Sequence, residues 1–427
     1  MMLIIVAAVF AALFSRAGFS QLSDSQWAWF SVIMAALASW AVIRPRFGWM
    51  ASLLFCTAVG NSVYLFMWAF NRYQQVKVYD KLGMVFFAAD ALAKLALVVL
   101  PIAMAMKQRE RSKDFGGLLF SGILLGNLAM VVHQFTATGD HCRTANTCGG
   151  MLGNPSMNST LMIAMLPLAM KYVRAPVSWL MFVTAVAAAV VTQSRAAVAM
   201  VAVYFLLEAV FRKRWEILAA GAVLIGGLWP VMLMVIRKPL MGSGDRVMMW
   251  EFFMRLWLLS PKYKHFGTWR DWWPVEMVDV AGVKFHMVTI ATEKWVELYN
   301  AVHWIHVPFG AGYGIFGVFA RNLQPIFKMR DKFWWWWMHN DWLQLAFETG
   351  VVGFSLGVAV YVMACRRFIR KGEKAEAQAL LLFGVCMSMN YPLHLALGCV
   401  FACWLVLLGL MRDDELDPSA FRPQNRN

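Results

Sequence analysis

Long apolar segments, separated mostly by short polar loops, cover most of the chain. A helix needs about 20 mostly apolar residues to cross a bilayer of about 30 Å, so each such segment predicts a transmembrane helix. Twelve segments qualify, at residues 2 to 19, 25 to 43, 47 to 70, 82 to 106, 115 to 137, 157 to 173, 176 to 193, 195 to 211, 215 to 236, 340 to 363, 378 to 395 and 397 to 411. The first is the least regular, because its apolar part ends near Phe14 and also resembles a short signal segment. The pattern predicts an all-α polytopic membrane protein.

The composition agrees with this class and excludes an ordinary soluble domain. Hydrophobic residues make up 60% of the chain, charged residues only 15%, and the mean hydropathy is +0.57. A soluble globular domain carries about 25% charged residues.

The positions of Lys and Arg predict the orientation, because short cytoplasmic loops are the positively charged ones. Basic residues occur in alternate loops, which are RPR (44 to 46), KQRERSK (107 to 113), Lys171 with Arg174, RKR (212 to 214), RRFIRK (366 to 371) and the tail from Arg412. One loop disagrees, since residues 71 to 81 carry three basic residues on the other side. We therefore expect a multi-pass membrane protein with both termini cytoplasmic. Attraction to anionic lipid explains most of the net charge of +15, and no nucleic-acid partner is expected.

Four parts follow from this topology. Residues 1–236 hold the first nine helices, 237–338 form a large outer loop or lid, 339–411 hold the last three helices, and 412–427 form a polar tail. The outer segment is rich in tryptophan, which favours packed or membrane-lying helices over a flexible linker. The tail contains two prolines and is expected to be disordered.

Two cysteines lie in a predicted outer loop. Cys142 and Cys148 bracket the sequence CRTANTC, and an oxidising compartment favours a local disulfide between them. A metal site that includes His141 is the alternative, although this spacing matches no established zinc pattern. The remaining five cysteines lie in or beside apolar segments and are interpreted as buried small hydrophobes.

The stretch FWWWWMHNDWLQLAFET, residues 333 to 349, combines interfacial tryptophans with polar groups. Asn340 or Asp341 is a suitable N-cap for the following helix. The acid at position 341 would also interact favourably with the positive end of the helix dipole. His339 would then stand just before the helix, at the mouth of an outer site. Glu348 lies about two turns inside the segment, where an acid is either functional or part of a structural ion pair with an arginine.

Two glycines follow this stretch. Gly350 and Gly353 are expected on one face of the same helix, where small residues allow another helix to approach closely.

Two arginines are expected at the same outer surface. Arg195 opens the eighth apolar segment, and Arg246 follows the ninth after a glycine-rich turn. Either one alone is most simply an interfacial anchor, but both together with His339 suggest a phosphate site, since guanidinium binds phosphate in a bidentate manner.

Weaker polar features occur nearby. Asn154 and Asn158 in GNPSMNST could line a cavity at the predicted outer site, or they could form a turn and a helix cap. The HWIH motif at 303 to 306 has the spacing of a metal pair but no nearby carboxylate, so neither a metal nor another cofactor is expected.

The order of four motifs resembles a known family. SRAAVAM, GDR with a tryptophan four residues later, VPFGAGYGIF and HNDWLQLAFETGVVG are similar to motifs of the O-antigen ligase and O-antigen polymerase superfamily. The resemblance covers about Asn154 to Gly353, and the predicted twelve-helix layout extends it to the whole chain.

The resemblance implies a GT-C-like helical fold and a metal-independent glycosyltransferase. The donor would be a glycan linked to undecaprenyl diphosphate, and the acceptor lipid A-core on the periplasmic side of the bacterial inner membrane. The outer loop at 237–338 would then be periplasmic. His339 would be the base, and Arg195 and Arg246 would bind the diphosphate.

Other functions remain open. The acceptor could be a growing glycan, as in a polymerase, or a protein hydroxyl, as in a protein O-oligosaccharyltransferase. A transporter or flippase of a lipid-linked sugar would also need arginines in a membrane cavity. Transporters of this kind contain paired repeats or helices broken near the bilayer centre, and the sequence indicates neither.

Overall fold

The computed structural model describes residues 109–137, 149–152, 154–192, 194–235, 250, 307–310 and 338–410 of the chain. Of these described residues, 89% are helical and none forms a strand. The predicted all-α class is therefore confirmed for this part of the protein. The first four predicted transmembrane segments, most of the predicted periplasmic segment and the tail lie outside it.

The long helices coincide with eight of the predicted segments. They are α5 (Arg109–Ala137), α6 (Pro155–Tyr172), α7 (Val177–Val191), α8 (Arg195–Arg212), α9 (Glu216–Val235), α15 (Asp341–Lys371), α16 (Lys374–Met389) and α17 (Ala396–Leu410). Two short 3₁₀ helices, η2 (Gly150–Leu152) and η5 (Pro392–His394), lie between them. The helices α5 and α15 extend beyond the apolar segments because their charged ends continue the helix past the hydrophobic stretch.

Length and apolar character support a membrane location. Among the described helices, Lys113–Ala137 and Asp341–Lys371 are long and apolar enough to cross a bilayer. Shorter apolar helices occur at Val177–Val191, Glu216–Gly227 and Leu397–Leu410. The total of twelve membrane spans and the large periplasmic loop remain predictions.

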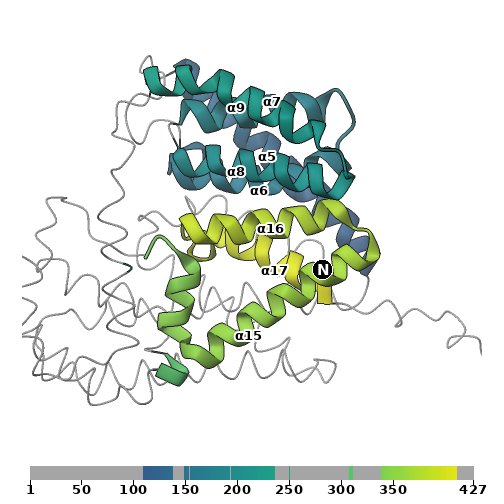
Figure 1. Ribbon diagram of the computed structural model, residues 1–427, viewed down its shortest axis with the longest axis vertical. Helices are drawn as coiled ribbons and strands as arrows, with labels where there is room; N and C mark the ends of the chain where they lie inside the picture. Colours follow the sequence, from purple (N-terminus) through teal and green to yellow (C-terminus); the bar gives the residue numbers. More distant parts are fainter. Residues whose placement is uncertain are drawn as a thin grey trace, which may run out of the picture.

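Helix α6 lies at the centre of the described bundle. It packs against α5, α7, α8 and α16, and its residues from Met157 to Ala169 are all buried. In Figure 1, α16 runs beside α6 and connects this group to α15 and α17. A helix that is apolar around most of its circumference is suited to such a central position.

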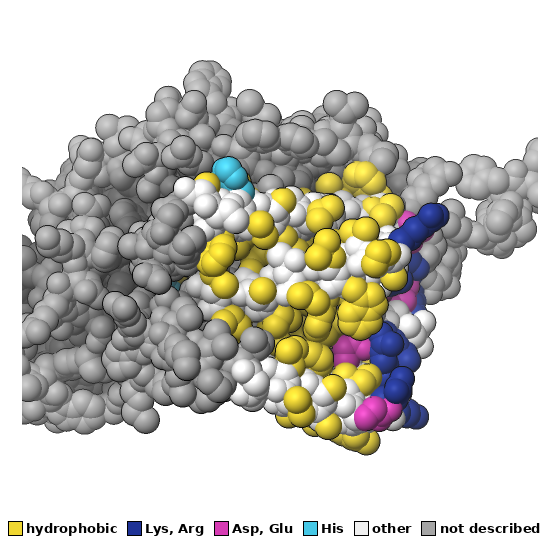
Figure 2. Space-filling model, turned by 90° about the horizontal axis from the view of Figure 1, so that it is seen from above, with side chains coloured by type: hydrophobic (Ala, Val, Ile, Leu, Met, Phe, Trp, Pro, Cys, Tyr) yellow, Lys and Arg dark blue, Asp and Glu magenta, His cyan; other side chains and the backbone are white. Residues whose placement is uncertain are grey.

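The side of the bundle presents a broad apolar surface. In Figure 2, hydrophobic side chains cover most of the visible described face, and Lys and Arg gather along one edge of it. Large apolar side chains are exposed on several helices, including Leu118, Trp179, Val183, Val223 and Val362. A surface of this extent would be unfavourable in water and is suited to contact with lipid.

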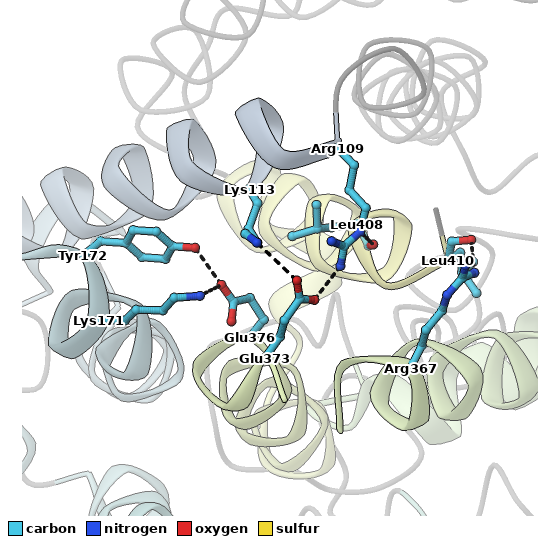
Figure 3. Close-up of polar contacts among 9 residues, drawn as sticks. All are labelled: Arg109, Lys113, Lys171, Tyr172, Arg367, Glu373, Glu376, Leu408 and Leu410. Carbon is cyan, nitrogen blue, oxygen red and sulfur yellow. Dashed lines mark hydrogen bonds and ion pairs between the residues drawn. The ribbon is translucent and has the colours of Figure 1, made fainter. Parts of the chain in front are cut away.

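The charged edge contains an ion cluster around Glu373, at the start of α16 (Figure 3). Its carboxylate accepts hydrogen bonds from Arg109 Nη2 and, at 3.2 Å, from Lys113 Nζ. Arg109 Nε also donates to the carbonyl of Leu408 at 3.3 Å. The start of α5 is thereby joined to the start of α16 and the end of α17.

A second carboxylate joins the end of α6 to the same edge. Glu376 is fully buried, and its Oε1 accepts from Lys171 Nζ at 2.5 Å and from Tyr172 Oη at 2.6 Å (Figure 3). Arg367 donates to the carbonyl of Leu410 at 2.6 Å. These contacts bring several of the predicted cytoplasmic loops to one end of the bundle, which we call the basic end.

Candidate functional site

The end opposite the basic end gathers the starts of four described helices. The helices α6, α8, α15 and α17 begin there, and α5, α7 and α16 end there. Ser156 and Ser194 hydroxyls lie 3.1 Å apart and link the starts of α6 and α8. Asn390, at the end of α16, links α6 to the start of α15, because its Nδ2 donates to Thr160 Oγ1 at 3.0 Å and its carbonyl accepts from Asp341 N at 3.2 Å.

His339 lies immediately before α15, as the sequence predicts. It has a left-handed backbone, with φ of 53°, which is uncommon for a residue with a side chain. Its half-buried imidazole packs edge-on against Tyr391, with the ring centroids 4.8 Å apart and the planes at 81°. The backbone conformation and the aromatic contact together define the direction of the imidazole.

The start of α15 is capped and tied to a neighbouring turn. Of the two residues predicted as N-cap, Asn340 is the one found, and its Oδ1 accepts from Leu343 N at 3.1 Å. Asp341 is buried in the first turn, and its Oδ2 accepts from Leu393 N at 2.6 Å. The carboxylate of Asp341 therefore lies at the positive end of the helix dipole, where an acid is stabilising. The same side chain also holds α15 against η5.

Glu348 lies deep in the first part of α15. Its side chain is 1% exposed, and Oε1 accepts from Gln344 Nε2 at 2.8 Å. Gln344 Oε1 accepts from Met338 N at 3.0 Å. The sequence interpretation did not include Gln344, although its spacing of four residues from Glu348 in an apolar helix could have indicated the pair.

The prediction for Gly350 is wrong. Gly350 has φ of 69° and ψ of −173°, so it breaks α15 instead of lying on a continuous helix face. The two parts of α15 run in different directions in Figure 1. The segment 307–310 packs against the break, where a Cβ on Gly350 would lie 2.4 Å from Gly310 N and from Pro308 C.

Within the part of the chain that the structure describes, the second glycine does not face another helix closely either. A Cβ on Gly353 would first meet the side chain of Thr349, in the preceding turn of α15.

The two asparagines of GNPSMNST have structural contacts. Asn154 is the N-cap of α6, and its Oδ1 accepts from Met157 N at 3.1 Å. Asn158 is fully buried and accepts from Asn127 Nδ2 at 2.6 Å, which joins α6 to α5. The cap interpretation fits Asn154, and burial keeps Asn158 away from an open surface.

Arg195 is the first residue of α8 and is partly exposed. Its helix is capped by Ser194, whose Oγ accepts from Ala197 N at 3.2 Å. The structure therefore brings Arg195 and His339 to the same end of the bundle. Each lies where the positive end of a helix dipole would favour an anion.

Three predicted residues lie outside the described part of the chain. These are Arg246, Cys142 and Cys148. Within the described ranges, no group of three or more His, Cys, Asp or Glu side chains could hold a metal ion, and the HWIH motif is outside them.

Comparison with models of known protein families, with curated proteins and with solved structures finds no match to this chain. The resemblance to the ligase and polymerase superfamily therefore remains a prediction from the sequence motifs.

Proposed function

We propose that the protein is a membrane glycosyltransferase of the O-antigen ligase type. It transfers a saccharide from undecaprenyl diphosphate to a lipid A-core acceptor on the periplasmic side of the bacterial inner membrane. The observation that carries this proposal is the placement of His339 and Arg195 at one end of the bundle, opposite the basic end. This placement supports the proposal, because the candidate base and a candidate cation for the diphosphate then lie together on the side that the charge pattern predicts to be periplasmic.

The proposed reaction is a single displacement at the anomeric carbon. His339 accepts the proton of the acceptor hydroxyl, and the acceptor oxygen forms the new bond to the anomeric carbon. The bond from that carbon to the diphosphate oxygen breaks, and undecaprenyl diphosphate leaves with the electron pair. Arg195 and Arg246 offset the charge that develops on the leaving group, and the sugar inverts its configuration.

Two related acceptors fit the same chemistry. A polymerase would present the hydroxyl of a growing glycan to His339, and a protein O-oligosaccharyltransferase would present a protein hydroxyl. The three activities differ only in the acceptor, so a comparison of acceptors with one donor distinguishes them.

A transporter of a lipid-linked sugar is the second candidate. The break in α15 at Gly350 favours it, because broken helices form the substrate sites of many transporters. Such a protein would move the donor across the membrane and form no new glycosidic bond.

The test uses the full chain in proteoliposomes with undecaprenyl diphosphate glycan and lipid A-core. We expect His339→Ala to bind the donor normally and to lower turnover by about 10² to 10⁴, the usual contribution of a general base. His133→Ala is the matched control, because His133 is an exposed histidine on α5 and should leave turnover unchanged. Full transfer by His339→Ala would refute the mechanism, and donor movement without glycan transfer would support the transporter.

The same assay tests the diphosphate site. Arg195→Ala should weaken donor binding, and Arg195→Lys should restore it poorly because lysine lacks the planar guanidinium group. Equal donor affinity in Arg195→Ala and the unmodified protein would remove Arg195 from the site.

A further inference from the structure

The peptide groups around Met338 are held from both sides. The Met338 N–H donates to Gln344 Oε1 at 3.0 Å, and its carbonyl accepts from Trp250 Nε1 at 2.6 Å. The Met338 side chain is fully buried. These contacts restrict rotation of the peptide groups on both sides of Met338.

His339 is the next residue, so the same contacts affect its imidazole. The carbonyl of Met338 belongs to the peptide that leads into the left-handed backbone of His339. A rotation of that peptide would move the ring away from Tyr391, against which it packs. The contacts that hold Met338 therefore also keep the imidazole of His339 in its orientation.

The orientation of the Gln344 amide is set by Glu348. A carboxylate can only accept hydrogen bonds, so Gln344 must direct its Nε2 toward Glu348, at 2.8 Å. This leaves Oε1 as the atom that faces the Met338 N–H. Both side chains are buried, at 0% and 1% exposure, where water competes little for these bonds.

We infer that Gln344 and Glu348 are positioning residues for His339. Glu348 orients the Gln344 amide, and Gln344 holds the N–H of Met338 while Trp250 holds its carbonyl. Met338, fixed in this way, holds the next residue, His339, at the acceptor hydroxyl. The inference rests on the proposed function for the part played by the base. The chain of contacts itself involves only residues of this protein.

Exchange of the two side chains gives a specific test. In Gln344→Glu, two carboxylates face each other at a distance where both cannot stay charged without separating. In Glu348→Gln, the new amide oxygen still accepts from Gln344 Nε2. In the double variant, the carboxylate introduced at position 344 would accept from both Met338 N and the amide introduced at position 348. Both contacts are then restored, and only the contact between positions 344 and 348 has its donor and acceptor reversed.

The four proteins are assayed as full chains in proteoliposomes with the donor and acceptor named above. The assays are run at alkaline pH. At lower pH the two carboxylates of Gln344→Glu could share a proton, and the resulting hydrogen bond would replace the one that the Gln344 amide donates to Glu348. We expect Gln344→Glu to lower kcat by about 10²-fold, the effect of a small misplacement of a reacting group, with donor affinity unchanged. The double variant should stay within about threefold of the unmodified protein, which is much less than that misplacement effect. Glu348→Gln should lower kcat less than Gln344→Glu does, because its amide oxygen can still accept from Gln344 although the amide no longer enforces that orientation. Gln378→Glu, at a buried glutamine of α16, controls for the added charge and should also keep its kcat.

A second measurement does not depend on transfer. The rate at which diethyl pyrocarbonate modifies His339, followed by peptide mass spectrometry, should change in Gln344→Glu and return in the double variant. Equal kcat in Gln344→Glu and the unmodified protein would overturn the inference, and so would a double variant as impaired as Gln344→Glu. If the unmodified protein transfers no glycan, the proposed function fails, and the His339 modification rates alone decide the inference.

Discussion

Gly350 shows how one residue determines the shape of a helix. Its backbone combines a φ of 69° with a ψ of −173°, a region that is essentially restricted to glycine. The missing side chain also allows Pro308 and Gly310 to approach the backbone. The first part of α15, which carries the contacts next to His339, therefore has its own direction because position 350 is a glycine.

Gly350→Ala should be strongly destabilising. The backbone strain and the overlap of the new Cβ with the segment 307–310 should together lower the free energy of unfolding by roughly 2 to 5 kcal/mol. The measurement is SDS-induced unfolding in mixed micelles. Gly122→Ala is the control, because Gly122 lies within α5 and a Cβ there would meet no neighbouring atom of the described residues within 4 Å. That control should be neutral or stabilising by up to about 1 kcal/mol, and an equal effect of both variants would contradict the explanation.

Helix α6 illustrates how a central element binds its neighbours. Three consecutive polar residues project in different directions, because successive residues of a helix are rotated by about 100°. Asn158 contacts Asn127 of α5, Ser159 lies 2.7 Å from the hydroxyl of Thr192 at the end of α7, and Thr160 accepts from Asn390 after α16. One short segment thus joins three other helices inside an apolar bundle, where hydrogen bonds replace contact with water.

Thr160→Val tests this role of α6. The change keeps the shape of the side chain but removes the acceptor for the buried Nδ2 of Asn390. The expected loss is about 1 to 3 kcal/mol in the free energy of unfolding, measured by the same SDS titration. Thr184→Val on α7 is the matched control, since that hydroxyl donates only to the carbonyl of Leu180 in its own helix and should change stability by less than about 0.5 kcal/mol. A loss of the same size in both variants would show that the contact with Asn390 contributes little.

The whole described bundle has two different ends and an apolar side. The basic end carries the ion clusters of Glu373 and Glu376, and the opposite end carries His339 and Arg195. This polarity suits a protein that crosses a membrane in one orientation, because basic groups favour the cytoplasmic leaflet.

Cysteine labelling tests this orientation. Lys213→Cys places a thiol at an exposed position of the basic end, and Thr136→Cys places one near the end of α5 on the opposite side. In intact spheroplasts, an impermeant maleimide should label position 136 and should label position 213 only after the membrane is opened. The unmodified protein measures the background from its own cysteines. Labelling of position 213 in intact spheroplasts would reverse the predicted topology.

The sequence by itself determined where most elements lie. The eight long helices of the described part coincide with apolar segments, because hydrophobicity over about 20 residues is a local property of the chain. Capping is local as well, so an asparagine such as Asn340 or Asn154 could be interpreted from its immediate neighbours. The alternation of basic loops also predicted which loops share one end.

Only the tertiary structure decided the contacts that give these elements their roles. Gly350 looked like a helix-packing residue until the segment 307–310 was found against it. The spacing of four residues can indicate the pair of Gln344 with Glu348, but only the structure shows the hydrogen bond between Gln344 and Met338. Asn158 could equally have lined a cavity, and its burial against Asn127 depends on how α5 and α6 pack. The physical reason is the same in each case, since the contacts join segments whose approach is set by packing and not by local sequence.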